Sequence, residues 1–137
     1  MTRLFLDTNI VMDLLDKRLP FCMDAARLFA MAYHKRIQLI VAPITYTTAS
    51  YLLSKQNNSK DVRAILANFR QLVRVAATNE RVIDDALASR FDDFEDAVQY
   101  YTAIKAKADI IITRNEKDFA ASKSPIMNAA EYLATIG

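Results

Sequence analysis

Short apolar runs alternate with longer amphipathic segments along this chain. The apolar runs predict buried strands at 4–6, 37–41, 72–76 and 110–112, and a short last strand at 124–126. Apolar residues spaced along one helix face predict helices at 10–15, 23–33, 43–55, 60–69, 78–88, 94–107 and 129–136. This alternation predicts an α/β fold, a three-layer sandwich whose central sheet of four to five strands is mostly parallel.

The length and composition fit one globular domain. The chain has 137 residues, of which 53% are apolar and 25% charged, and no repeat or linker divides it. We therefore expect a single domain over residues 1–137. The formal net charge of +2 neither requires nor excludes a nucleic-acid partner, because a basic rim can surround an acidic pocket.

Cysteine, glycine and histidine each occur once, and the shortages of cysteine and glycine each exclude a class of site. Cys22 alone gives no disulfide framework and no thiolate zinc site. Gly137 is the last residue, so phosphate-binding loops and dinucleotide-binding motifs are excluded. His34 lies near a predicted helix end, where a solvated side chain is the favoured interpretation. No apolar stretch has membrane-spanning length and no signal sequence opens the chain, so we expect a cytoplasmic protein without membrane association.

Polar side chains gather where two of the predicted strands end. Asp7 follows the strand at 4–6, and Thr113-Arg114-Asn115 follows the strand at 110–112. An acidic segment at 92–96 opens the helix that leads to the second of these strands. The carboxyl ends of parallel strands meet at one edge of a sheet, which is where ligands bind in such folds. Carboxylates gathered there from separate elements indicate a divalent-metal site.

These acids also have structural interpretations. An aspartate before a helix, such as Asp7, is common at a helix start. Asp93 and Asp96 fall at the N-cap and third position of a helix, where acids contribute about 1 kcal/mol to stability. Asp118, before Phe119, is also typical of a turn. The placement of several polar groups at strand ends nevertheless favours the metal site.

Three segments together resemble the motifs of the PIN domain family. The first family motif is matched by Leu6-Asp7-Thr8-Asn9-Ile10-Val11. The central motif resembles Phe94-Glu95-Asp96-Ala97-Val98-Gln99, and the last is similar to Ile112-Thr113-Arg114-Asn115-Glu116-Lys117-Asp118-Phe119. The motifs fall in the family order over essentially the whole chain. The family consists of metal-dependent ribonucleases and includes the VapC toxins of bacterial toxin–antitoxin pairs.

The resemblance implies roles for the matching residues. Asp7 and Asp96 would be ligands of Mg²⁺ or Mn²⁺. Asn115 would be a further ligand or a hydrogen-bonding partner of the metal-bound water. Thr113 and Asn9 would order these groups.

The chain departs from the family pattern at a position that matters for metal binding. The family normally supplies a glutamate from the helix after the second strand, and the apolar pattern places Thr48 there. Asn115 is neutral where many members carry aspartate. Neutral oxygens in place of carboxylates predict weaker metal binding. The acids available to compensate are Glu95, Asp93 and Asp118.

The implied function is endonucleolytic hydrolysis of RNA phosphodiester bonds, with the protein acting as the toxin of a type II toxin–antitoxin pair. The implied partners are RNA, an antitoxin protein and a second copy of the chain, bound through the apolar face of an N-terminal helix. One alternative is a catalytically weakened PIN-fold module that binds RNA or protein. A 5′-nuclease-like activity on structured DNA ranks last, because the chain lacks the extra helices used to grip duplexes.

Aromatic and basic side chains can bind nucleic acid, the aromatic ones by stacking on bases and the basic ones by contacting phosphates. The tyrosines lie at helical spacing beside leucine and isoleucine, which favours core or interface positions over base stacking; they are Tyr46, Tyr51, Tyr100 and Tyr101. Five basic residues are interpreted as solvated helix faces rather than a phosphate-binding rim: Arg63, Arg70, Arg74, Lys105 and Lys107.

Overall fold

Five parallel strands form the centre of the molecule. The computed structural model describes residues 1–119 and 122–136, so Gly137, the end of the predicted domain, lies outside the described residues. The strands are β1 (Thr2–Leu6), β2 (Ile37–Val41), β3 (Val73–Val75), β4 (Ile110–Ile112) and β5 (Ile126–Met127). Their order in the sheet is β3-β2-β1-β4-β5, and every pairing is parallel. The predicted fold class is confirmed.

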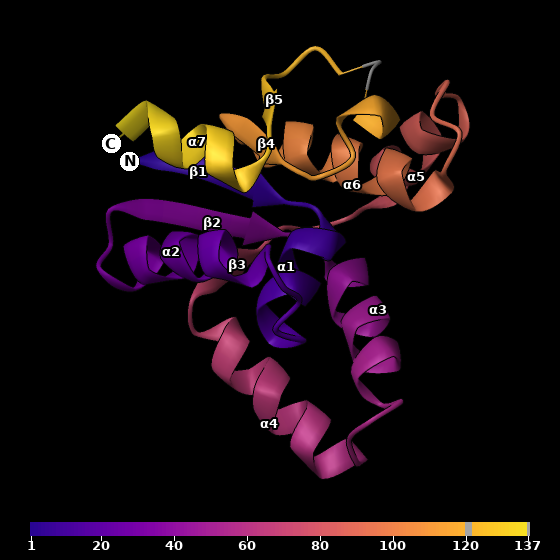
Figure 1. Ribbon diagram of the computed structural model, residues 1–137. Helices are drawn as coiled ribbons and strands as arrows, with labels where there is room; N and C mark the ends of the chain where they lie inside the picture. Colours follow the sequence, from indigo (N-terminus) through magenta and orange to yellow (C-terminus); the bar gives the residue numbers. More distant parts are fainter. Residues whose placement is uncertain (120–121, 137) are drawn as a thin grey trace.

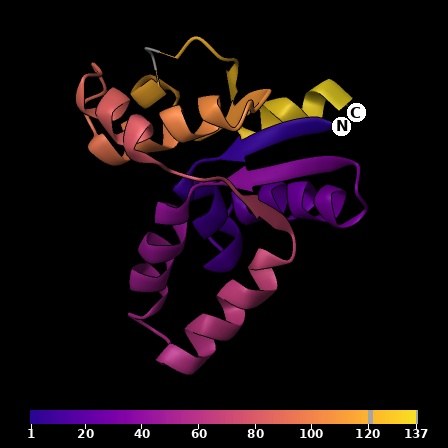
Figure 2. The ribbon, with the colours of Figure 1, turned by 180° about the vertical axis from the view of Figure 1, so that it is seen from behind.

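Helices cover both faces of this sheet. They are α1 (Thr8–Leu15), α2 (Cys22–Tyr33), α3 (Pro43–Leu53), α4 (Ser59–Arg70), α5 (Glu80–Leu87), α6 (Phe94–Lys105) and α7 (Ala129–Ile136). Figures 1 and 2 show α5 and α6 on one side of the sheet and α1 to α4 on the other. None of the helices in the described ranges has the length and apolar character needed to cross a bilayer.

Two short elements near the C-terminus differ from the prediction. The last strand was predicted at 124–126 but lies at Ile126–Met127. Pro125 has no N–H to donate, and only its carbonyl oxygen joins the sheet, accepting from Ile111 N at 3.0 Å. The 3₁₀ helix η1 (Glu116–Phe119) was not predicted, because four residues show no helical periodicity.

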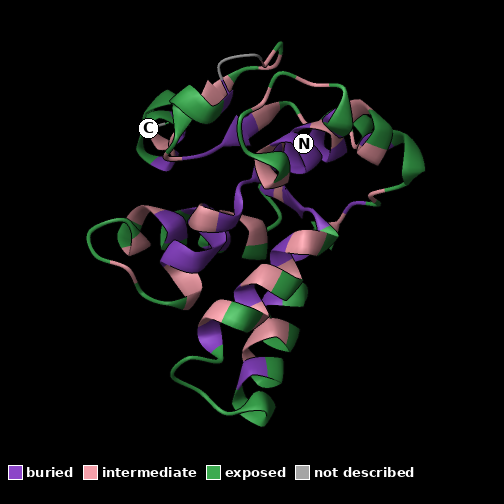
Figure 3. Cartoon of the chain, turned by 90° about the vertical axis from the view of Figure 1, so that its right-hand side faces the viewer, coloured by how far each residue is buried: buried purple, intermediate pink, exposed green. Residues whose placement is uncertain are grey.

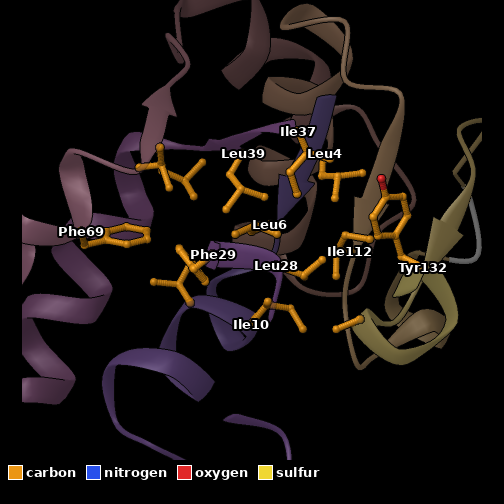
Figure 4. Packing of buried hydrophobic residues seen from close by; sticks show 14 residues of the cluster. Leu4, Leu6, Ile10, Leu28, Phe29, Ile37, Leu39, Phe69, Ile112 and Tyr132 are labelled. Carbon is orange, nitrogen blue, oxygen red and sulfur yellow. The ribbon is translucent and has the colours of Figure 1, made fainter. Parts of the chain in front are cut away.

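Alternate residues of β1 face two separate apolar layers. Leu4 and Leu6 pack with residues of α1, α2, α4 and α7, as Figure 4 shows. Phe5, between them, packs on the opposite face with residues of α6 such as Tyr100 and Ala103. Because both faces are buried from Leu4 to Leu6, this part of β1 is entirely apolar, which is why its position could be predicted from the sequence.

The helices α3 and α4 form a hairpin that extends away from the sheet (Figure 1). Its own small core joins Ala49 and Leu53 of α3 to Val62 of α4 and Met12 of α1. The turn at the tip of the hairpin is exposed in Figure 3. The hairpin thus presents long helical surfaces beside the carboxyl end of the sheet.

Three helices end with a lysine in the left-handed backbone region. Lys17, Lys35 and Lys107 have φ angles of 49°, 58° and 59° and follow α1, α2 and α6. After α6, Lys107 N bonds to Ile104 O at 3.0 Å and Ala108 N to Ala103 O at 3.1 Å, the pattern of a Schellman motif. Glycine usually occupies this position, so a chain with one terminal glycine places strained lysines there.

The chain changes direction across the sheet between β1 and β4. β2 and then β3 are added on one side of β1, and β4 and then β5 are added on its other side. The connections after β1 and β4 therefore leave on opposite sides. Such a switch point opens a crevice at the carboxyl ends of the two strands.

Candidate functional site

Asp7 lies at this switch point, directly after β1. Asp7 is buried, with only 3% of its surface exposed. The Asp7 N–H donates to the carbonyl oxygen of Ile112, the last residue of β4, at 3.0 Å. The Thr113 hydroxyl donates to Asp7 Oδ2 at 2.8 Å. Both strand ends are therefore joined at the position where the sequence predicted them to meet.

The buried Thr113 hydroxyl also orders the loop that follows β4. It accepts a hydrogen bond from the backbone N–H of Asn115 at 3.0 Å. The Asn115 side chain itself is exposed, as is Asp118 in η1. Asn9, in the first turn of α1, is partly exposed two residues beyond Asp7. Thr113 thus connects Asp7 to the backbone of Asn115.

Asp93 and Asp96 form the start of α6. Asp93 is the N-cap, and its Oδ1 accepts a hydrogen bond from Asp96 N at 3.0 Å, as the capping interpretation predicts. Burial first, and then the negative charges of nearby acids, raise the pKa of Asp96 from 3.8 to about 7. The acids are Asp7, Asp93, Asp118 and Glu95. Capping by Asp93 and the clustering of acids around Asp96 therefore coexist.

Glu95 reaches from α6 to the α3 position where the resemblance places a glutamate. The Thr48 hydroxyl donates to Glu95 Oε1 at 3.2 Å, and Gln99 Nε2 donates to Oε2 at 3.5 Å. Burial, and to a smaller extent the charges of Asp93 and Asp7, raise the pKa of Glu95. Of the predicted compensating acids, Glu95 is the one that contacts Thr48.

A buried polar network lies beneath these acids, and the sequence analysis missed it. Gln99 is 0% exposed, and its Oε1 accepts from the backbone N–H of Thr8 at 3.0 Å and from the Thr8 hydroxyl at 3.3 Å. The Thr8 hydroxyl also shares a hydrogen bond of 3.0 Å with the Thr45 hydroxyl. Burial raises the pKa of Asp7, and hydrogen bonds from Thr113 and Gln99 oppose this shift. The spacing of Gln99 four residues after Glu95 was the available signal.

An ion pair beside the site was also missed. Arg114 Nε and Nη2 donate to Asp13 Oδ2 and Oδ1 at 2.8 and 3.0 Å, a bidentate pair whose aspartate is 1% exposed. The Phe21 ring centroid lies 4.0 Å from Arg114 Cζ. These side chains line a cavity of about 350 Å³ between α1, α2 and α7. The pair fixes the loop between Thr113 and η1 against α1.

The donor chemistry of the acidic site suits a hard divalent cation. Asp7, Glu95 and Asp96 offer carboxylate oxygens, and burial is the main cause that raises the pKa of each, with repulsion from neighbouring acids adding to it at Glu95 and Asp96. In residues 1–119 and 122–136, no three acidic, histidine or cysteine side chains converge into a complete metal cage. Mg²⁺ commonly binds through one or two carboxylates and keeps several waters, so this arrangement fits it. It does not fit a closed zinc site.

Known proteins of the same fold share this architecture. The structure is similar to VapBC2 from Rickettsia felis bound to a promoter DNA fragment, with TM-score 0.69 and 18% identity over 93% of this chain and 98% of that one. A toxin–antitoxin complex from Klebsiella pneumoniae gives TM-score 0.68 and 22% identity over 91% and 96%. The sarcin-ricin loop cleaving toxin VapC20 of Mycobacterium tuberculosis gives TM-score 0.69 and 19% identity over 87% and 95%.

Sequence comparison points the same way. The chain is 23% identical over 134 residues to Ribonuclease VapC1 of Aquifex aeolicus (strain VF5), an alignment that covers 95% of this chain and 92% of the relative. The family model described as "PIN domain" matches residues 3–117. That match includes the strand ends of β1 and β4 and the start of α6, where the acidic site is built. The chain belongs to the PIN domain family.

Proposed function

We propose that this protein is a Mg²⁺- or Mn²⁺-dependent endoribonuclease that hydrolyses RNA phosphodiester bonds. The observation that carries the proposal is the gathering of Asp7, Glu95 and Asp96 at the β1–β4 switch point, with the pKa of each raised. Burial of carboxylates, and the repulsion among acids that adds to it at Glu95 and Asp96, are offset when a divalent cation binds. The ribonuclease and toxin names of the similar proteins support the same conclusion.

Each residue of the site has a role in this proposal. Asp7 and Asp96 hold the cation, and Glu95 supplies the carboxylate that the family usually carries on α3. When bound, the cation lowers the pKa of a water and neutralises charge on the scissile phosphate. Thr113 fixes the orientation of Asp7, and Asn115 orders the attacking water.

Further polar groups surround these ligands in the proposal. Asp93 and Asp118 add negative charge that favours the cation, and Thr48 holds Glu95 by its 3.2 Å hydrogen bond. Asn9 supports the first turn of α1 next to Asp7. Asp93 also keeps the start of α6 in place as its N-cap.

The proposed biological role is that of a cytoplasmic toxin neutralised by an antitoxin protein. The similar structure from Klebsiella pneumoniae is a toxin–antitoxin complex, which supports this role. We also propose a homodimer. The apolar residues Ile10, Val11 and Met12 of α1 are buried within the protomer, so the expected interface moves to the exposed Leu19 and Met23 near the start of α2. A monomeric mass by light scattering would contradict the dimer.

RNA cleavage with Mn²⁺, with Mg²⁺ and with EDTA tests the activity. Wild type should cut a mixed RNA only with a divalent cation, and Asp7→Asn should abolish cutting. Asp84→Asn, on the exposed face of α5, is the matched control and should cut like wild type. Unchanged metal-dependent cutting by Asp7→Asn would overturn the mechanism.

A second candidate function is an RNA- or protein-binding module with a weakened site. The neutral Thr48 on α3 is the observation that favours it. Thr48→Glu distinguishes the two functions. If wild type cuts nothing and Thr48→Glu cuts RNA with Mn²⁺, the natural protein is the binding module.

A further inference from the structure

One stripe of α3 leads from the acidic site towards the tip of the helical hairpin. Thr48 and Tyr51 are three residues apart in α3, so their side chains lie along one face, and Lys55 in the turn after α3 reaches the Tyr51 ring. Thr48 touches Glu95 at the start of this stripe. With a rise of about 1.5 Å per residue, Tyr51 lies about 4.5 Å farther along the helix axis, and Lys55 follows in the turn after α3. The stripe ends where α3 turns towards α4.

Tyr51 differs from the other tyrosines named in the sequence analysis. Tyr100 is buried, and the Tyr46 ring packs against Phe69 with centroids 5.5 Å apart. Tyr51 is 66% exposed. Of the two expected positions, core or interface, this exposure excludes the core. The Lys55 ammonium nitrogen lies 5.1 Å from its ring centroid, which orients the ring and places a positive charge beside it.

A small polar hollow continues the stripe beyond Lys55. It measures about 190 Å³ and lies between the end of α3 and the turn after α1. Its lining includes two cations, Arg18 and Lys55, and the amides of Gln56 and Asn57. Asp16 also lines it and lies 3.5 Å from Arg18, so one of the two cations is partly balanced. The hollow therefore keeps positive charge and several hydrogen-bond donors.

The acidic site cannot attract a polyanion by itself. Asp7, Glu95 and Asp96 repel phosphates, and one divalent cation offsets only part of that charge. An RNA substrate must therefore gain most of its affinity outside the acids, from stacking and from cationic side chains. The α3 stripe offers both, and it begins at a side chain that contacts Glu95.

We infer that this stripe binds single-stranded RNA, with an unpaired base stacked on Tyr51 and flanking phosphates held by Lys55 and Arg18. The inference rests on the proposed ribonuclease function. A stacking face requires a base that is not enclosed in a duplex, so the substrate class is unpaired RNA. Stacking on tyrosine tolerates any base, so this contact adds affinity without sequence specificity.

Binding can be tested apart from cleavage. Fluorescence anisotropy in EDTA measures the affinity of a labelled oligouridine of about 12 nucleotides, a length in the range that single-strand sites cover. A self-complementary RNA duplex of the same length is the second probe. We expect the single strand to bind more tightly than the duplex.

Substitutions on the stripe should act in separable ways. Tyr51→Ala should weaken single-strand binding about tenfold, and Tyr51→Phe should restore it, because the aromatic face is kept. Lys55→Gln should reduce the slope of log affinity against log salt by about 0.7. The matched controls are Tyr33→Ala, at a tyrosine 70% exposed at the end of α2, and Lys105→Gln, at the far end of α6.

The outcomes separate this inference from the proposed function. If Tyr51→Ala binds the single strand like wild type, the inference is overturned even where cleavage is demonstrated. If binding behaves as expected but no cation supports cutting, the binding surface stands and the nuclease proposal fails. If Tyr51→Ala leaves RNA binding intact but changes the mass of the protein in solution, the stripe is a protein interface and the inference is wrong.

Discussion

The Thr48 hydroxyl donates a hydrogen bond of 3.2 Å to Glu95 Oε1 and so connects α3 to α6. The PIN pattern places a glutamate at the Thr48 position, and here the carboxylate approaches the same point from the opposite helix. Gln99, one turn after Glu95, holds its second oxygen. Glu95 thus brings a carboxylate from α6 to the α3 position where the family pattern has its glutamate.

If Glu95 replaces the family glutamate, its removal should weaken cation binding. Glu95→Gln should lower Mn²⁺ affinity about tenfold or more, the loss typical when a group at a metal site is altered. Isothermal titration calorimetry with Mn²⁺ measures this change. Glu80→Gln, at the exposed start of α5, should bind like wild type. Equal Mn²⁺ affinity in both variants would show that Glu95 does not serve the cation.

The pKa of Asp96, raised to about 7, makes the stability of the cation-free protein depend on pH. Between about pH 4 and pH 7 the folded protein keeps a proton that the unfolded chain has released, so the free energy of unfolding falls as pH rises. Denaturant unfolding in EDTA should show this fall in wild type. In Asp96→Asn, which has no carboxyl to titrate at this position, the fall in the free energy of unfolding should be smaller by about 1 kcal/mol. The difference is modest because solvent screens much of the repulsion around a half-exposed carboxyl.

The same proton should compete with the cation. Mn²⁺ affinity in wild type should rise with pH up to about pH 7 and then level off, since Asp96 must lose its proton to bind. A profile that stays flat from about pH 5 to pH 8 would contradict the assignment of Asp96 as a ligand.

Breaking the bidentate Arg114–Asp13 pair should destabilise the fold. Arg114→Ala leaves the buried Asp13 carboxylate without its partner, and we expect the free energy of unfolding to fall by about 3 kcal/mol. Arg81→Ala removes an exposed pair with Asp85 and should cost less than about 0.5 kcal/mol. Urea unfolding of both variants makes the comparison, and equal losses would refute the importance of burial here.

Relief of backbone strain should stabilise the protein. Lys107→Gly replaces a lysine at φ 59° after α6 with the residue that this conformation favours, and should raise the free energy of unfolding by about 1 kcal/mol. Lys105→Gly, within the last turn of α6, should lower it by about 1 kcal/mol. Thermal unfolding of the two variants should therefore shift in opposite directions.

The sequence revealed the parts of the fold that depend on local pattern. β1, β2 and β4 are mainly apolar because both of their faces are buried. Asp93 was recognised as a helix cap from its spacing to Asp96. Contacts between distant segments left no such pattern. Arg114 and Asp13 are 101 residues apart, and the sequence around each of them does not indicate that they form a pair. The exposure of Tyr51 likewise depends on how the α3–α4 hairpin leaves the sheet.

The pairing of β1 with β4 also determines when the acidic site can assemble during synthesis of the chain. Asp7 leaves the ribosome early, but Thr113, its hydrogen-bond partner, follows 106 residues later. A nascent or truncated chain that ends before β4 contains Asp7 but lacks the strand that pairs with β1. Parallel pairing between segments so far apart in the sequence forms late in folding. For a protein proposed to cut cellular RNA, we therefore expect incomplete chains to lack the assembled acidic site.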